Sequence, residues 1–451
     1  MKKIIERAGP GARFSRTSQV LQQIRKEKLT WRLFRMLYED RVHRQLAGQS
    51  GAGIEGQSGD LIAGQSGAGI EGQSGDLIAE QSGALGGSSD WAVYRELLKC
   101  DGQFREMKLI IDWCEQSVDD QFDDTDALKY FKNKPFLWDA TLHQIKSKSK
   151  HTDLNSIDPD APLRSEKALT SEDSVDDSRL LYAIFVYIRS GQLQKAVNLC
   201  MNSGQSWRAA MLVGGNLART TAGRSEDGGG PVGEGNANRA LWKSICWQMG
   251  ENSSVSALER AVFAALSGHL TQLLPVCRSW EDRLWAYCLA ATEWNLHKAL
   301  VESARDPGGL PPLPASSADQ ADFSVEEILQ QAEAGSEQSV ELSAKDPYRL
   351  IQKSLILGET AQCVEELHGW IGEQQGGGGA APRHLVRFLA HLILVFRQYG
   401  LPCGDVYANG ILELYTRQLM EGDESRWRAV PAYAARLPEQ SRVEVVAEFL
   451  Q

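Results

Sequence analysis

Hydrophobic residues recur with a helical period along most of the chain, and the clearest stretch is Asp177–Val213. Its first helix carries two apolar stripes on different faces: Leu181, Ile184 and Ile188, and Tyr182, Phe185 and Val186. A helix that is apolar on more than one face must be covered from more than one side. The pattern therefore predicts stacked helices, with neighbours in front of this segment and behind it.

Glycines separate the predicted helices at recurring joints. Gly191 and Gly204 end two helices of this stretch, and the pattern around Gly191 recurs at Gly268 and, more weakly, at Gly358. Glycine suits a helix end because it takes the left-handed conformation without a Cβ clash. The joints are unequally spaced, which predicts an all-α, irregular α-solenoid of stacked helical hairpins rather than a regular repeat family.

Interruptions of the helical pattern divide the chain. A tandem octad, GQSGAGIE and GQSGDLIA, holds too little apolar surface to order itself, and the Gly-rich stretches near 228–230 and 376–379 also predict disordered inserts. The predicted segments are a basic N-terminal helical segment at 1–47, the octad-repeat insert at 48–88, N-terminal helices at 89–157, helical hairpins at 158–305 with a flexible loop at 214–238, a linker at 306–322 and further helices at 323–451.

Composition narrows the class of protein. The 451 residues carry a net charge of −11, which argues against a general nucleic-acid binder. Residues 2–45 are nonetheless basic, and two interpretations stay open: an RNA-binding or membrane-surface helix, or the solvated face of an amphipathic helix. No signal peptide is visible. The most apolar run, Leu385–Tyr399, contains charged residues and is shorter than the ~20 residues of a membrane span, so it predicts a buried helix of a soluble chain.

No pattern of catalytic or ligand-binding residues stands out. The eight cysteines form no C-x-x-C pair, and most lie within apolar helical patterns, as small core residues of a reducing compartment do. The acidic run at 119–126 lacks the spacing of a calcium loop. Dispersed histidines such as His269 and His391 are typical of satisfied core groups. Phosphate-loop, dinucleotide, nucleophile-elbow and zinc-protease motifs are missing, so we expect no enzyme, no cofactor and no metal.

Several blocks of sequence, in order along the chain, resemble the nuclear pore protein 107 family. They are TWRLFRMLYEDR (30–41), DPDAPLR (158–164), RLLYAIFVYIRSGQLQKAVNLCMNSGQSWRAAML (179–212), LWKSICWQM (241–249), ERAVFAALSGHLTQLLPVCRSWEDRLWAY (259–287) and HLVRFLAHLILVFRQYGL (384–401). The family is a scaffold nucleoporin of the Y-shaped coat complex, similar to a smaller yeast counterpart. The resemblance fails at the octad repeat and at the Gly-rich inserts.

The resemblance implies an element shared with vesicle-coat proteins, in which helices form a trunk and fold back as a crown. It implies a structural role at the nuclear envelope, in the pore, on which mRNA export and protein import depend. In the family the crown meets a nucleoporin of the 96-kilodalton class, and a C-terminal tail meets one of the 133-kilodalton class. The chain stops before most of that tail, which puts attachment through it in doubt.

The predicted partner surface lies on the crown-like hairpins. Its candidate residues are Tyr182, Phe185, Val186 and Arg189 on one helix and Phe263 and Leu266 on another. The competing interpretation is that the solenoid itself buries these faces. Two other functions stay open at this point: a coat or adaptor of vesicle traffic with the same architecture, and an RNA-binding module that uses Lys2–Arg44.

Overall fold

The computed structural model describes most of the predicted helical residues. The described ranges are 12–50, 89–119, 129–131, 134, 136–147, 154, 156–224, 231–303, 323–334, 346–376, 382–422 and 424–451. The octad repeat from residue 51, the acidic run from residue 120, the linker at 306–322 and residues 377–379 lie outside them. Within the described part of the chain, every element except one hairpin is a helix, which confirms the all-α prediction.

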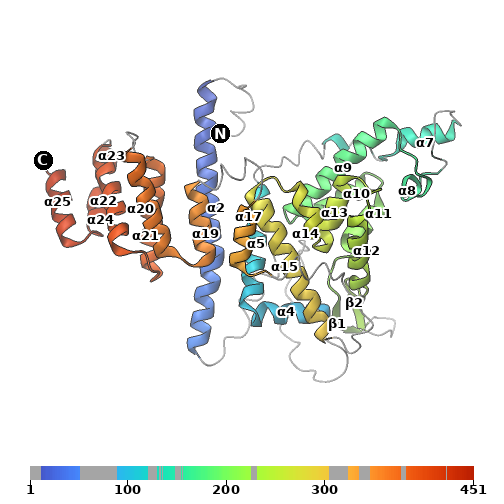
Figure 1. Cartoon of the computed structure of the whole chain (residues 1–451), viewed down its shortest axis with the longest axis horizontal. Helices are drawn as coiled ribbons and strands as arrows, with labels where there is room; N and C mark the ends of the chain where they lie inside the picture. The colour runs from blue at the N-terminus through green and yellow to red at the C-terminus, as the bar shows by residue number, and fades with distance from the viewer. Residues whose placement is uncertain are drawn as a thin grey trace. The chain divides into compact units, whose positions relative to one another are not determined.

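The chain divides into two compact units, of which the first combines residues 1–37 with residues 342–451. Besides the beginning of α2 (Ala12–Ser50), its elements are α19 (Pro347–Leu357), α20 (Thr360–Gly376), α21 (Arg383–Gln398), α22 (Asp405–Met420), α23 (Glu424–Trp427), α24 (Val430–Ala434) and α25 (Glu439–Phe449). Helices α20 to α25 follow one another as a row of hairpins (Figure 1). Aromatic rings hold α2 in this unit, since Trp31 lies 5.3 Å from Phe388 and Phe34 lies 5.9 Å from Phe396, centroid to centroid.

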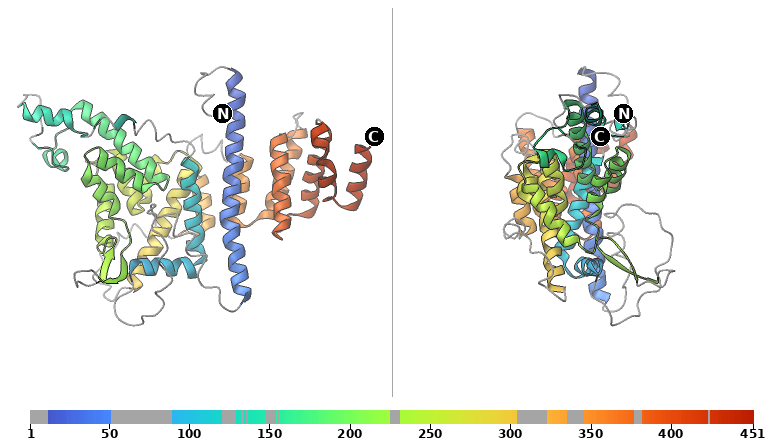
Figure 2. Two further views of the ribbon diagram at one scale, coloured as in Figure 1. Left: turned by 180° about the vertical axis from the view of Figure 1, so that it is seen from behind. Right: turned by 90° about the vertical axis from the view of Figure 1, so that its right-hand side faces the viewer.

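The second unit comprises residues 38–341. Its helices are α4 (Asp90–Cys100), α5 (Gly102–Asp119), α7 (Asp139–Lys146), α8 (Ala161–Ser165), α9 (Ser171–Arg189), α10 (Leu193–Asn202), α11 (Ser206–Val213), α12 (Arg239–Glu251), α13 (Ala257–Ser267), α14 (Leu270–Leu273), the 3-10 turn η1 (Leu274–Val276), α15 (Trp280–Ser303) and α17 (Val325–Glu333). Helix α5 packs along α15, and α13 packs on both α9 and α12 (Figures 1 and 2). The hairpins therefore stack on one another through shared faces.

The predicted glycine joints are confirmed. The φ angles of Gly191, Gly204, Gly268 and Gly358 are 69°, 72°, 76° and 78°, in the left-handed region that favours glycine. Gly191 is followed at once by α10, while Gly268 ends α13 and Gly358 ends α19. The sequence thus located the turns between hairpins correctly, because the reason for each glycine is local.

The predicted flexible loop at 214–238 is wrong in part. Strand β1 (Arg219–Arg224) pairs antiparallel with β2 (Pro231–Glu234), in a register that sets Arg219 opposite Glu234. Contacts at the base fix the hairpin: the amide of Trp91 donates to the carbonyl of Ala218 at 3.1 Å, and the Arg219 guanidinium lies 3.9 Å from the Trp91 ring centroid. The two strands are short, polar and Gly-rich, so their own sequence pattern does not predict strands. Contacts with residues far along the chain determine that they form.

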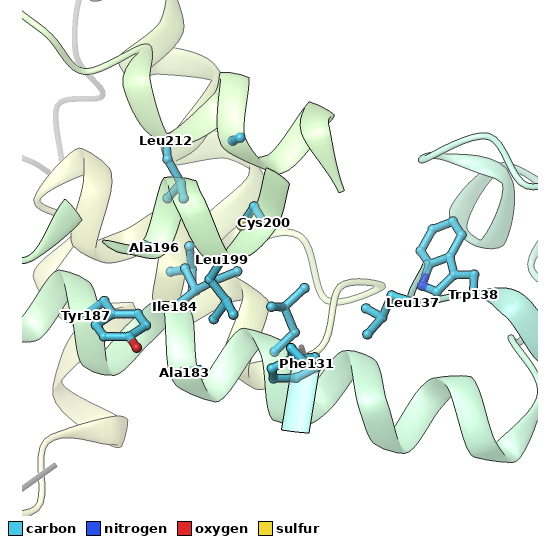
Figure 3. Packing of buried hydrophobic residues seen from close by; sticks show 13 residues of the cluster. Phe131, Leu137, Trp138, Ala183, Ile184, Tyr187, Ala196, Leu199, Cys200 and Leu212 are labelled. Carbon is cyan, nitrogen blue, oxygen red and sulfur yellow. The ribbon is translucent and has the colours of Figure 1, made fainter. Parts of the chain in front are cut away.

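A hydrophobic core surrounds the α9 joint. Tyr187 and Ile184 of α9 meet Ala196 and Leu199 of α10 and Leu212 of α11, as Figure 3 shows. Seven of the eight cysteines are buried and only Cys100 is exposed, so the prediction that most cysteines are small core residues is confirmed. Helix α21 is also buried as predicted, with Leu385, Phe388 and Phe396 at 2% exposure or less. No helix in the described ranges is long and apolar enough to cross a bilayer.

Candidate interaction surface

Helix α9 begins at a polar cap and ends at a glycine joint. The Thr170 hydroxyl accepts from the amide of Asp173, and Glu172 and Asp173 place negative charge in the first turn, where the helix dipole favours it. One face, including Leu180, Ile184 and Tyr187, is fully buried. The expectation that this helix needs neighbours on more than one side is confirmed, because α10, α13 and α7 all pack on it.

Of the predicted surface residues on α9, Tyr182 is the exposed one. Its relative exposure is 53%, and Val175, two turns earlier, is 52% exposed. Phe185 is half-buried and packs on the core of the α9 joint. Val186 is buried, at 8% exposure. The structure therefore leaves one aromatic ring and one aliphatic side chain of α9 available to a partner.

Arg189 is buried within the helical stack. Its Nε donates to Asp282 Oδ1 at 2.9 Å, and its Nη1 donates to the carbonyl of Cys114 at 2.7 Å. The guanidinium also lies 5.1 Å from the centroid of the Trp285 ring. Through these contacts Arg189 connects α9 to α5 and α15, so its charge is occupied inside the chain.

Phe263 and Leu266 lie on α13, where neighbouring helices cover them. Phe263, 6% exposed, belongs to a cluster with Cys246 and Val255, and the half-buried Leu266 packs on both that cluster and the core of the α9 joint. Phe185 and Leu266 thus pack against the same core, inside the stack. The six predicted residues do not form one exposed face in the isolated chain, because the hairpins that carry them pack on each other.

A buried charge network joins α12 to α15. Glu293 of α15 accepts from Arg239 Nη2 at 2.8 Å and from Lys243 Nζ at 2.9 Å, while the Lys243 side chain is 1% exposed. Burial lowers the pKa of His297, one turn further along α15, to about 4, and the Lys243 and Arg239 charges add to this shift. Perturbed groups can indicate catalysis, but burial inside this network, with the charges next to it, accounts for the shift of His297.

Two glutamates, Glu115 of α5 and Glu293 of α15, lie against glycine joints. A Cβ added at Gly191 would lie 2.3 Å from Glu115 Oε2, and one added at Gly268 would lie 3.0 Å from Glu293 Cβ. Burial raises the pKa of Glu115 to about 7, with Lys108 opposing that shift, and Trp285 Nε1 donates to its carboxyl at 3.3 Å. These glutamates support the joints, a role that the sequence pattern did not reveal.

The two histidines singled out in the sequence lie in packed surroundings. His269 is buried, stacks on the Trp247 ring at 3.9 Å, and has its Nε2 3.3 Å from Glu251. His391 is hydrogen-bonded at both ring nitrogens, to the Arg387 carbonyl at 2.6 Å and to the Tyr433 hydroxyl at 2.9 Å. Among the residues described, no three histidine, cysteine or carboxylate groups come together as metal ligands.

Two further exposed apolar residues lie on α12. Leu241 and Ile245, one turn apart, are 54% and 52% exposed. The apolar residues of 241–249 occupy more than one stripe of the helix. This wider distribution is the sequence signal that could have identified Leu241 and Ile245. The exposed apolar positions of the second unit therefore include residues of both α9 and α12.

The comparisons with known proteins agree on one family. The family model described as Nuclear pore protein 84 / 107 matches residues 21–451. The chain is 31% identical to Nuclear pore complex protein Nup107 of Mus musculus, over 100% of this chain and 46% of the relative, and the Homo sapiens protein of that name gives the same figures. The Drosophila melanogaster protein is 26% identical, over 96% of this chain and 48% of the relative.

The chain spans about half the length of these relatives. The match covers both helical units, from α2 to α25, and agrees with the all-helical architecture and with the resemblance seen in the sequence blocks. The chain belongs to the Nuclear pore protein 84 / 107 family.

Proposed function

We propose that this chain is a scaffold subunit of the nuclear pore complex, in its Y-shaped coat at the nuclear envelope. In that role it supports pore assembly, and through it mRNA export and protein import. The observation that carries the proposal is the family match over residues 21–451, which includes both helical units. The vesicle-coat alternative receives no support from the relatives, all of which bear nucleoporin names.

The packing of the second unit suits a structural role. Buried or partly buried charge pairs between helices are costly to break, because removal of one partner leaves the other charge unpaired. Arg189 with Asp282 and Lys243 with Glu293 make such pairs between α9, α12 and α15. The proposed role is therefore structural and not catalytic, since these perturbed groups are used in packing.

The N-terminal basic helix is better suited to packing than to RNA. The side chains of Arg41 and Arg44 donate to Glu106 at 2.8–3.3 Å, and Lys26 pairs with Asp346. The Arg41 and Arg44 pairs with Glu106 are largely shielded from solvent, so these cations are less available to phosphate than cations of exposed pairs. A shallow salt dependence of RNA binding is the expected result, and a steep one that disappears on deletion of 2–44 would favour the RNA hypothesis.

Localisation tests the proposal directly. The full chain, fused to a fluorescent protein and expressed in cells, should give a nuclear-rim signal that coincides with a known nucleoporin. A signal on Golgi or endosomal membranes would support the vesicle-traffic function instead, and a diffuse signal would contradict the scaffold role.

The proposed first partner is a nucleoporin of the 96-kilodalton class, bound through the crown-like residues 158–305. Tyr182 is the candidate anchor on this surface, because an exposed aromatic ring beside Val175 can bury apolar area on binding. The other five candidates, Phe185, Val186, Arg189, Phe263 and Leu266, are buried or half-buried, so they contribute to the packing of the helices that carry this surface. Attachment to the 133-kilodalton class, which the resemblance assigns to a C-terminal tail, is not proposed for this chain.

A matched pair of variants tests the Tyr182 surface. Tyr182→Asp should weaken co-purification of the 96-kilodalton-class partner by at least about tenfold, with little change in the melting temperature because the side chain is exposed. Met201→Asp serves as the control, since Met201 is an equally exposed apolar residue of the same unit at 56% exposure. Equal binding by both variants would remove Tyr182 from the interface. Phe185→Asp is less informative, because its half-buried ring contributes to folding.

A further inference from the structure

An open pocket in the first unit brings three arginine side chains together. Its volume is about 390 Å³, and its principal lining residues are Arg383, His384 and Arg387 of α21, Tyr415 and Gln418 of α22, and Arg426 of α23. Arg383 and Arg387 are one turn apart, so they project from the same side of α21. Three guanidinium groups border this pocket, together with apolar surface of the same lining.

Two of these guanidiniums already bind carboxylate groups of the chain. Arg387 Nη2 donates to both oxygens of Glu27 of α2, at 2.7 and 2.5 Å, and Arg383 Nη2 donates to Glu421 at 2.8 Å. The Arg383–Glu421 pair is highly exposed, with side chains 56% and 63% accessible, so it exchanges easily with another anion. Within the described part of the chain, no carboxylate is paired with Arg426 of the lining.

Two neutral groups of the lining complete a polar site. The Gln418 side-chain oxygen is buried and has no hydrogen-bond partner among the described residues. Rotation of that amide exchanges its oxygen and nitrogen and would aim N–H donors at a bound anion. The Arg387 and Arg426 charges both act on the Tyr415 hydroxyl, against the larger effect of burial that raises its pKa, so these cations converge on one region.

A phosphate group suits two guanidiniums better than a carboxylate does, because it offers more acceptor oxygens. A carboxylate that replaced Glu421 on Arg383 would exchange one equivalent pair for another. A phosphomonoester carries about −1.5 to −2 charges and three strong acceptor oxygens, so it can bridge several guanidiniums at once. The pocket is open to solvent at the exposed ends of Arg383 and Arg426, which allows the ligand to be one side chain of an extended segment.

We propose that this Arg-lined pocket binds a phosphorylated side chain of a partner peptide segment. Arg426 and Arg383 hold the phosphate, Arg387 remains on Glu27 and adds positive potential, and the Gln418 amide donates to a phosphate oxygen. Arg clusters that recognise phosphorylated motifs work on the same principle. The site would make attachment of this unit dependent on phosphorylation of its partner.

A defined peptide tests the proposal on the full chain. Fluorescence anisotropy is measured with labelled Ala-Ala-phosphoserine-Ala-Ala, and the same peptide with unmodified serine is the reference. We expect binding only by the phosphorylated peptide. Arg426→Gln should weaken it by about tenfold or more, because one charge-assisted hydrogen bond is lost. Glu421→Gln should strengthen it, because Arg383 is then released.

Arg428→Gln is the matched control. Arg428 is an exposed cation in the same segment, but it is not part of the pocket lining, so the affinity should change less than twofold. An equal loss in Arg426→Gln and Arg428→Gln would show non-specific attraction and overturn the proposal. Equal binding of the phosphorylated and unmodified peptides would also overturn it. Inorganic phosphate that competes as strongly as the peptide would show a free-phosphate site and contradict the peptide assignment.

Discussion

Gly191 lies directly against the carboxyl group of Glu115, so the joint between α9 and α10 fits closely on α5. The left-handed backbone of Gly191, with φ of 69°, is one reason for glycine at this position, and the proximity of Glu115 is a second. Sequence periodicity reveals the first reason because it is local. The second depends on a residue 76 positions earlier in the chain, which only the fold brings near.

Gly191→Ala should lower the stability of the second unit. The left-handed backbone alone costs about 1–2 kcal/mol with a Cβ, and contact at 2.3 Å with Glu115 Oε2 adds to that cost. The thermal midpoint, measured by circular dichroism, should therefore fall. Gly400→Ala is the control for the backbone effect, because φ is 68° there and no atom lies within 4 Å of the added Cβ. A smaller loss in Gly191→Ala than in Gly400→Ala would contradict the role of Glu115.

Glu115→Gln should change how stability depends on pH. Burial raises the pKa of Glu115 from 4.5 to about 7, so the folded chain holds a proton that the unfolded chain releases. The resulting stabilisation is complete below about pH 4.5 and is lost as the pH rises through about 7. Glutamine keeps an acceptor for the Trp285 N–H but does not titrate.

The measurement compares urea midpoints of wild type and Glu115→Gln between pH 4.5 and 8. Wild type should lose stability relative to the variant across this range. The difference between the two proteins is needed, because His297, whose pKa is lowered to about 4, gives wild type and variant alike an opposite slope between about pH 4 and 6.5. A constant difference would mean that Glu115 titrates normally.

Arg189→Ala should destabilise the chain far more than removal of an exposed arginine. Arg189 is 4% exposed, and its removal leaves Asp282 without a cation. Loss of one member of such a pair typically costs about 3–5 kcal/mol when both members are buried. Asp282 is 24% exposed, so we expect about 2 kcal/mol or more. Arg164→Ala, which removes pairs at 58% exposure, should cost less than about 1 kcal/mol. Chemical denaturation distinguishes the two, and equal effects would argue against the buried pair.

Gly369→Ala should stabilise the first unit by about 0.5–1 kcal/mol. Gly369 lies within α20, is exposed, and has no atom within 4 Å of an added Cβ, so alanine reduces the entropy lost on folding without a clash. Gly410→Ala in α22 is the matched comparison, because its Cβ would lie 2.8 Å from His368 Nε2. The thermal midpoint should rise in the first variant and rise less or fall in the second. A lower midpoint for Gly369→Ala would indicate a contact that the structure lacks.

Local patterns were sufficient for the helices and for their joints. Helix α19 (Pro347–Leu357) is an example, because a proline begins it and Gly358 follows its last residue, and both signals are local. The exposed residues of the proposed interface were harder to identify from the sequence pattern. Tyr182 and Val186 belong to one apolar stripe in the sequence, yet one is 53% exposed and the other 8%, because the folded chain covers Val186 and leaves Tyr182 in contact with solvent.

The sequence by itself determined the helical class, the glycine joints and the family resemblance, since helical periodicity, left-handed turns and ordered blocks of residues are all properties of short stretches. The tertiary structure alone decided the hairpin at Arg219–Glu234, the burial of Arg189 and the Arg-lined pocket. Each of these depends on residues that are distant in sequence. Burial and electrostatic environment are set by which helices meet, and no local pattern contains that information.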